Sequence, residues 1–195
     1  MKKFSPLMIV HLVLMALMAF GTVGGAIHFI VDAANAPGTK ELLSDLTNTL
    51  LMAAILATIA MGAIYLLREY VKQAAIYYKA FMLLHVAVCA LTICVDLVFY
   101  QVNTLLILIC VLNAVKLADL LILTFAKDLG QEKTWIFFYV LLGCDLLQLI
   151  LAIPYMAGIG FNFSFTGYVT ALVMDGTIGL SIRGKYRDKA SRGRA

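Results

Sequence analysis

Four aspartates lie inside long apolar stretches of this 195-residue chain, at Asp96, Asp119, Asp145 and Asp175. A lysine, Lys116, lies three residues before the second of them. A carboxylate near the centre of a bilayer costs at least ~2.5 kcal/mol on insertion scales, so such groups usually pair, carry protons or line a polar pathway. These five side chains are therefore the first candidates for function.

Lys116 and Asp145 are predicted to form an ion pair. Lys116 lies 11 residues from Lys127, and Asp145 lies 12 residues from Lys133. At a rise of about 1.5 Å per helical residue, both side chains reach the same depth, near the middle of a membrane. Consecutive antiparallel helices would bring them together.

Asp119 and Asp175 are predicted to form an inner site with His11 as a third member. Each of the three lies eight residues from a basic residue that marks one end of its apolar run, at Lys127, Arg183 and Lys3 respectively. Two carboxylates close together in a poorly solvated place cannot both ionise easily, so one would hold a proton. Such a pair could couple to protons or bind a cation.

Further polar residues extend this set. Asn113, Lys116 and Asp119 recur at helical spacing and share one face, and Asp145 shares a face with Gln148. Asp96 lies 17 residues from Lys79, in the half of its span that is farther from the basic flank. The predicted residues for binding a substrate or ion are Asp119, Asp175, Asp145, Lys116, Asp96, Asn113, Gln148 and His11.

Composition decides the class of protein that must hold these charges. The chain is 63% hydrophobic and 13% charged, whereas soluble domains are ~45–50% apolar and ~25% charged. A surplus of this size has to face lipid. Six continuous runs reach the ~20 residues that a membrane-spanning helix needs. They lie at about 6–31, 44–67, 80–101, 103–126, 134–156 and 161–182.

The sequence thus predicts an all-α, polytopic integral membrane protein: one transmembrane domain over residues 1–195, with a basic tail at 183–195. The first run is too long for the ~7–15-residue core of a signal peptide, so we expect it to be retained. Basic residues flank both ends and every second connection, which predicts cytoplasmic termini. We expect a multi-pass protein of the cell membrane, in bacteria the cytoplasmic membrane. The net charge of +4 reports topology and not nucleic-acid binding.

Small residues at four-residue spacing predict where helices approach closely. Gly21 and Gly25 form such a pair in the first run, and Ala53 and Ala57 form another in the second, where Thr58 and Gly62 repeat the spacing.

Catalytic, metal and cofactor sites are not expected. The four cysteines contain no Cys-x-x-Cys pair, and the three histidines are too dispersed for a haem pair. His85 and Cys89 have the spacing of a dyad, but no third group to orient them is evident.

The leading hypothesis is a small transport protein, or the membrane subunit of a transporter, for a small polar or cationic solute, with coupling to protons or cations through the intramembrane acids. Its architecture resembles that of the substrate-binding membrane subunits of vitamin import systems. A non-transporting assembly, immunity or regulatory protein is the second hypothesis, and a membrane-embedded enzyme is the third. The expected partners are the lipid bilayer, the solute, and a membrane subunit or second copy.

Overall fold

The computed structural model describes residues 5–68, 74–99, 101–126, 129–159 and 163–192. These residues form six α-helices: α1 (Pro6–Ala34), α2 (Thr39–Arg68), α3 (Ala74–Phe99), α4 (Thr104–Phe125), α5 (Gln131–Ile159) and α6 (Phe163–Arg192). No strand occurs among them. The all-α prediction is therefore confirmed.

Local sequence explains where two of the helices begin. Ser5 caps α1, where its hydroxyl accepts a hydrogen bond from the Met8 N–H at 3.3 Å, and Pro6 occupies the first helical position. Asn103 caps α4 in the same way, with its Oδ1 2.8 Å from the Leu106 nitrogen. Both caps satisfy a backbone donor that has no partner within the helix.

Several helix boundaries differ from the predicted ones. The connection between the first two helices is shorter than the predicted residues 32–43, because α1 continues to Ala34 and α2 begins at Thr39. α5 continues to Ile159, beyond the predicted end at residue 156. α6 continues to Arg192 through the predicted tail. Polar flanks continue a helix beyond the apolar run because alanine, lysine and arginine are good helix formers.

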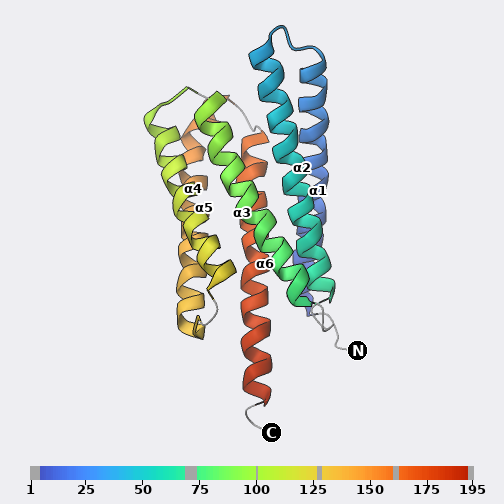
Figure 1. Ribbon diagram of the computed structural model, residues 1–195, viewed down its shortest axis with the longest axis vertical. Helices are drawn as coiled ribbons and strands as arrows, with labels where there is room; N and C mark the ends of the chain where they lie inside the picture. Colours follow the sequence, from blue (N-terminus) through green and yellow to red (C-terminus); the bar gives the residue numbers. More distant parts are fainter. Residues whose placement is uncertain (1–4, 69–73, 100, 127–128, 160–162, 193–195) are drawn as a thin grey trace.

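The helices pack in chain order, each against the next, and α6 closes the ring against α1 and α2. Figure 1 shows α6 between the α4–α5 pair and the α1–α2 pair, with α3 passing beside it. α1 begins and α6 ends at the same end of the bundle, which we call the terminal end. Helices α1, α3 and α5 therefore run away from the terminal end, and α2, α4 and α6 run toward it.

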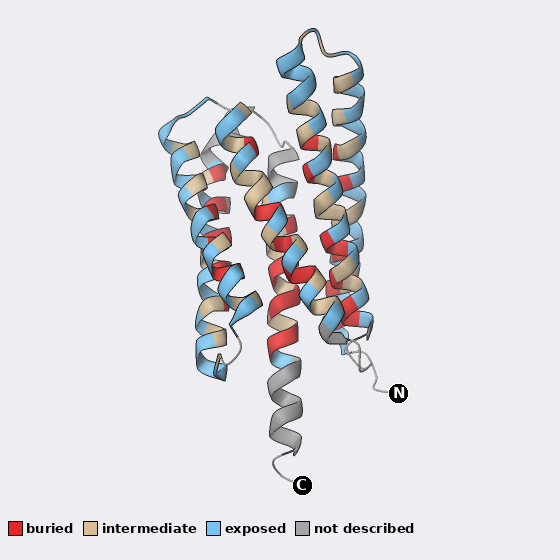
Figure 2. Cartoon of the chain, in the orientation of Figure 1, coloured by how far each residue is buried: buried red, intermediate tan, exposed pale blue. Residues whose placement is uncertain are grey.

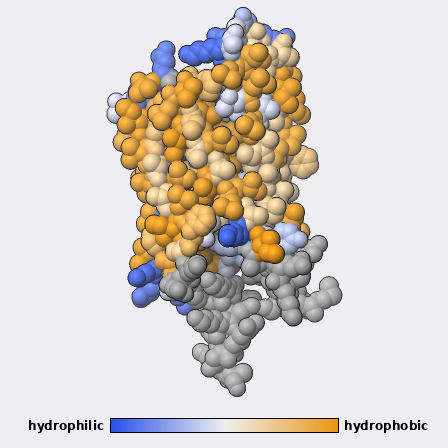
Figure 3. All heavy atoms as spheres, in the orientation of Figure 1, coloured by the Kyte–Doolittle hydropathy of each residue, from blue (hydrophilic) through white to orange (hydrophobic). Residues whose placement is uncertain are grey.

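Apolar side chains cover the outside of the bundle. Five helices are long and apolar enough to cross a membrane, over Pro6–Ala34, Thr39–Leu67, Ile76–Phe99, Thr104–Phe125 and Gln131–Ile153. Large residues face outward on them, Phe20 with 78% of its surface exposed. Figure 3 shows this apolar belt with polar residues toward both ends, and Figure 2 shows the buried positions on inward faces and along α6.

The predicted small-residue contacts are wrong at three of six positions. Gly25 is buried, but Gly21, Ala53 and Ala57 are exposed, and a Cβ at Gly21 would meet no atom within 4 Å. The predicted pair Thr58 and Gly62 is confirmed, because Thr58 is 0% exposed and a Cβ at Gly62 would lie 3.0 Å from side-chain atoms of Met15 and Phe81. The four-residue spacing identifies a helix face but not the direction in which that face points.

Candidate functional site

Four ionisable side chains from four helices meet inside the bundle: His85 from α3, Lys116 from α4, Asp145 from α5 and Asp175 from α6. None of these residues is more than 4% exposed. We call these four residues the charge cluster. Because backbone segments of α3 and α4 do not pack directly on α6 in the described part of the chain, long side chains bridge the interior there.

Lys116 is at the centre of the charge cluster. Its ammonium donates a hydrogen bond to Asp145 Oδ1, which confirms the predicted pair. The same nitrogen lies 3.9 Å from Asp175 Oδ2. On the other side of Asp175, His85 Nε2 lies 3.3 Å from Oδ1. One cation thus serves two carboxylates, and an imidazole flanks the second of them.

Hydrogen bonding within the charge cluster is incomplete. Five buried side-chain atoms have no aligned hydrogen-bond partner among the described residues. They are His85 Nδ1, Asp119 Oδ2, Asp145 Oδ2 and both carboxylate oxygens of Asp175. All lie in or beside the charge cluster. Buried polar groups in proteins are normally satisfied, so orphan atoms concentrated at one place point to a functional role there.

The predicted inner site of Asp119, Asp175 and His11 is not assembled as expected. Asp119 is buried one turn beyond Lys116, but the ionic contacts of Asp175 go to His85 and Lys116. His11 bonds through Nε2 to Thr177 Oγ1 at 3.0 Å. Thr177 lies about 200° around α6 from Asp175, so the two residues face different helices. His11 therefore faces away from Asp175, whereas Asp119 lies close enough to Asp175 to interact with it electrostatically.

Asn113 and Gln148 form a neutral pair beside the charge cluster. Gln148 Nε2 donates to Asn113 Oδ1 at 2.7 Å, and both side chains are buried. Each lies one turn from its charged neighbour, Lys116 or Asp145, toward the end of the bundle opposite the terminal end. Asp96 lies farther along α3 in that direction, is only partly buried, and is not a member of the charge cluster.

Toward the terminal end, apolar side chains follow the charge cluster directly. Leu120 and Ile178 lie one turn or less after Lys116 and Asp175, while Met82 and Leu141 lie about one turn before His85 and Asp145. All four side chains are fully buried, at 0% exposed. They pack in one hydrophobic cluster together with Phe81, Phe138 and Ile182. We call these seven residues the apolar layer. The surroundings of the charge cluster are therefore polar on one side and apolar on the other.

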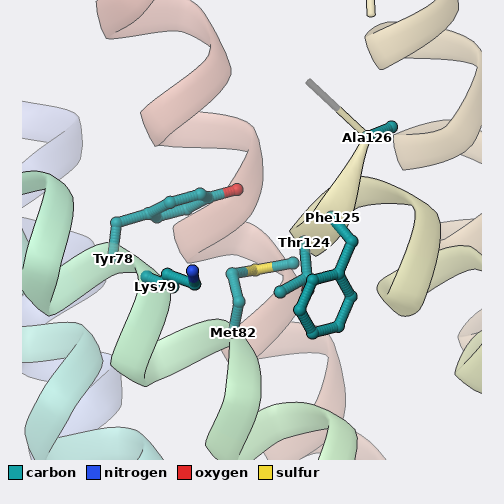
Figure 4. A pocket seen from close by; sticks show the side chains of 6 residues that line it. All are labelled: Tyr78, Lys79, Met82, Thr124, Phe125 and Ala126. Carbon is teal, nitrogen blue, oxygen red and sulfur yellow. The ribbon is translucent and has the colours of Figure 1, made fainter. Parts of the chain in front are cut away.

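A pocket of about 260 Å³ opens between the start of α3 and the end of α4, beyond the apolar layer. Its lining residues are Tyr78, Lys79, Met82, Thr124, Phe125 and Ala126. Figure 4 shows Met82 extending from α3 across to Thr124 and Phe125. Because Met82 belongs to both the pocket and the apolar layer, this one layer separates the pocket from the charge cluster.

The sequence pairs His85 only with Cys89 and does not predict its contact with Asp175. The available signal was depth, since His85 lies six residues from Lys79 and Asp175 eight from Arg183. In the structure the Cys89 thiol donates to the Asn113 carbonyl oxygen at 3.2 Å. Within the described ranges, no group of His, Cys, Asp and Glu is arranged to hold a metal ion.

Comparisons with known protein families, with curated proteins and with solved structures found no match to this chain.

Proposed function

We propose that this chain is a multi-pass protein of the cell membrane that transports a small polar or cationic solute, with the charge cluster as its coupling site. Five apolar helices and an apolar outer surface support the membrane assignment. α1 begins and α6 ends at the same end of the bundle, where the described residues Lys79 and Lys133 also lie. This agrees with cytoplasmic termini under the positive-inside rule.

The observation that carries the proposal is a buried excess of negative charge with unpartnered oxygens. Two carboxylates surround one ammonium, and three of their four oxygens lack an aligned donor. A pair that only held helices together would need one acid for Lys116. The second acid, Asp175, is 0% exposed and must be compensated by something that arrives and leaves.

The surroundings of the charge cluster are those of a site open to one side. The polar pair Asn113–Gln148 continues toward one end of the bundle, and the apolar layer closes the way to the other. Transport requires the two sides to be exposed in turn, by movement of helices about a fixed central site. Opening the apolar layer would connect the charge cluster to the pocket at Met82.

The test is charge movement in proteoliposomes. Ammonium, methylammonium and guanidinium are applied one at a time to wild-type vesicles on a solid-supported membrane. We expect a transient current with at least one of them, and its loss in Asp175→Asn, because this change removes the uncompensated charge. His28→Gln is the control, since His28 is exposed at the far end of α1 and pairs with Asp32. Silent wild-type vesicles containing monodisperse protein would overturn the proposal.

A scaffold protein is the second candidate. Several polar contacts join helices one by one, among them His11 to Thr177 at 3.0 Å and Tyr65 to Ser181 at 2.7 Å. Such contacts stabilise helix packing by about 0.6–2 kcal/mol each. They explain the polar residues along α6 but not the excess acid beside Lys116.

A further inference from the structure

We infer that the charge cluster takes up a single proton, shared by His85 and Asp175, and that it does not bind a metal cation such as Na⁺. The inference rests on the proposed function and names its coupling ion.

The charge balance requires one added positive charge. With a neutral imidazole, Lys116 contributes one positive charge and Asp145 and Asp175 contribute two negative charges. The sum is one negative charge among residues that are at most 4% exposed. An uncompensated ion in a low-dielectric interior is strongly unfavourable, whereas a neutral group of ion pairs is tolerated. Uptake of one positive charge makes the charge cluster neutral.

The neighbours of Asp175 favour a proton over a metal ion. Na⁺ and other hard cations need several oxygen ligands. Two nitrogens lie next to Asp175, His85 Nε2 at 3.3 Å and Lys116 Nζ at 3.9 Å, together with the carboxyl group of Asp145. A metal ion here would lie beside an ammonium that repels it.

The nearest neutral oxygen acceptors are already committed. Asn113 Oδ1 accepts from Gln148, and the Asn113 backbone oxygen accepts from the Cys89 thiol. The carboxylate oxygens that lack an aligned donor offer a proton the one acceptor atom that it needs, whereas a metal ion needs a shell of ligands.

The proton has defined places to bind. It comes from water and adds to the unpartnered His85 Nδ1 or to an Asp175 oxygen. With the imidazole protonated, the charge cluster consists of two ion pairs, Lys116–Asp145 and His85–Asp175. Release of the proton to water restores the single negative charge.

Other titratable groups face the charge cluster and set the background for this uptake. Asp119 on α4 is buried one turn from Lys116 and adds a fourth unpartnered carboxyl oxygen. Cys89 on α3 and Cys144 on α5 are buried thiols beside His85 and Asp145. His11 on α1 packs on the opposite face of α6, against Gly176. None of these is a cation that could replace the proton.

The experiment follows the imidazoles of the full-length protein by ¹⁵N NMR in nanodiscs. The chain has three histidines, and His→Gln replacements assign them. As pH is lowered, we expect the His85 resonance to report uptake of one proton, at a position that Na⁺ or K⁺ does not alter. Asp175→Asn should shift or abolish that step. His28→Gln, which removes the exposed imidazole, should leave it unchanged.

Two outcomes would overturn the inference. One is a His85 resonance that does not change over the pH range in which the protein stays monodisperse. The other is release of protons into unbuffered solution when NaCl is added to wild-type protein, a measurement that needs no variant. Both readouts are independent of transport. Protein that binds the proton but moves no solute would refute the proposed function alone, and a carrier coupled to Na⁺ would refute this inference alone.

Discussion

Lys116 is the residue on which the balance of buried charge depends. It is 4% exposed and is in ionic contact with both Asp145 and Asp175. A buried ion pair adds little to stability compared with an apolar pair of similar volume, but removing one partner leaves a charge that nothing compensates. The contribution of each member therefore depends on which neighbours remain.

This dependence predicts an unequal result for the two single replacements. Lys116→Met leaves two carboxylates without their ammonium and should cost ~3–5 kcal/mol of unfolding free energy. Asp145→Leu should cost less, because Lys116 keeps Asp175 within 3.9 Å. The double variant should lose clearly less than the sum of the two. Unfolding of the purified protein in detergent measures all three.

The exposed pair of His28 and Asp32, 2.6 Å apart on α1, supplies the matched control. Surface ion pairs contribute little, so replacing either member should barely change stability. Additive losses from Lys116→Met and Asp145→Leu would contradict the coupling that the structure shows.

At the scale of elements, α6 organises the interior. Its residues contact side chains of α1 through Thr177, of α3 and α4 through Asp175, and of α2 through Ser181. Glycines permit this density of contacts. A Cβ at Gly176 would lie 2.7 Å from His11 Cε1, and one at Gly179 would lie 2.7 Å from Phe138 Cζ. Both glycines lie within four residues of Asp175, and they allow close approach between helices.

We therefore predict that Gly176→Ala destabilises the packing of α1 on α6 by about 1–3 kcal/mol, the usual cost of overpacking. Gly143→Ala on α5 is the control, because a Cβ there would meet no atom within 4 Å. Alanine is also the better helix former, so Gly143→Ala should be neutral or stabilising. Equal melting temperatures for the two variants would show that α1 does not pack this closely on α6.

At the scale of the whole molecule, the six helices form a closed ring whose first and last helices meet. An even number of antiparallel helices brings both chain ends to one side (Figure 1). Among the described residues, Lys79 near the start of α3 and Lys133 near the start of α5 lie on that side as well. In a membrane, this arrangement should have a fixed orientation.

We predict that reporters fused to either terminus are cytoplasmic. A cysteine introduced at Gly38, in the link between α1 and α2, should react with a membrane-impermeant thiol reagent from outside, in a background lacking the four native cysteines. The physical reason is the cost of moving basic flanks across the membrane. A C-terminal fusion that is accessible from outside intact cells would reverse the topology.

The sequence alone predicted how many helices form, roughly where they lie and at what level along its helix each polar residue lies. Apolar run length predicts the helices, because about 20 residues cross the hydrocarbon. The constant rise per residue predicts depth, and equal depth on consecutive helices was enough to pair Lys116 with Asp145.

Only the tertiary structure decided which residues face one another. It turned Asp175 toward His85 and Lys116, turned His11 toward Thr177, and left Ala53 and Ala57 on the outside. The physical reason is that depth depends on position along one helix, whereas the direction of a side chain depends on how that helix is rotated against its neighbours. Rotation is set by packing among residues far apart in the sequence, as between α6 and the three helices that surround Asp175.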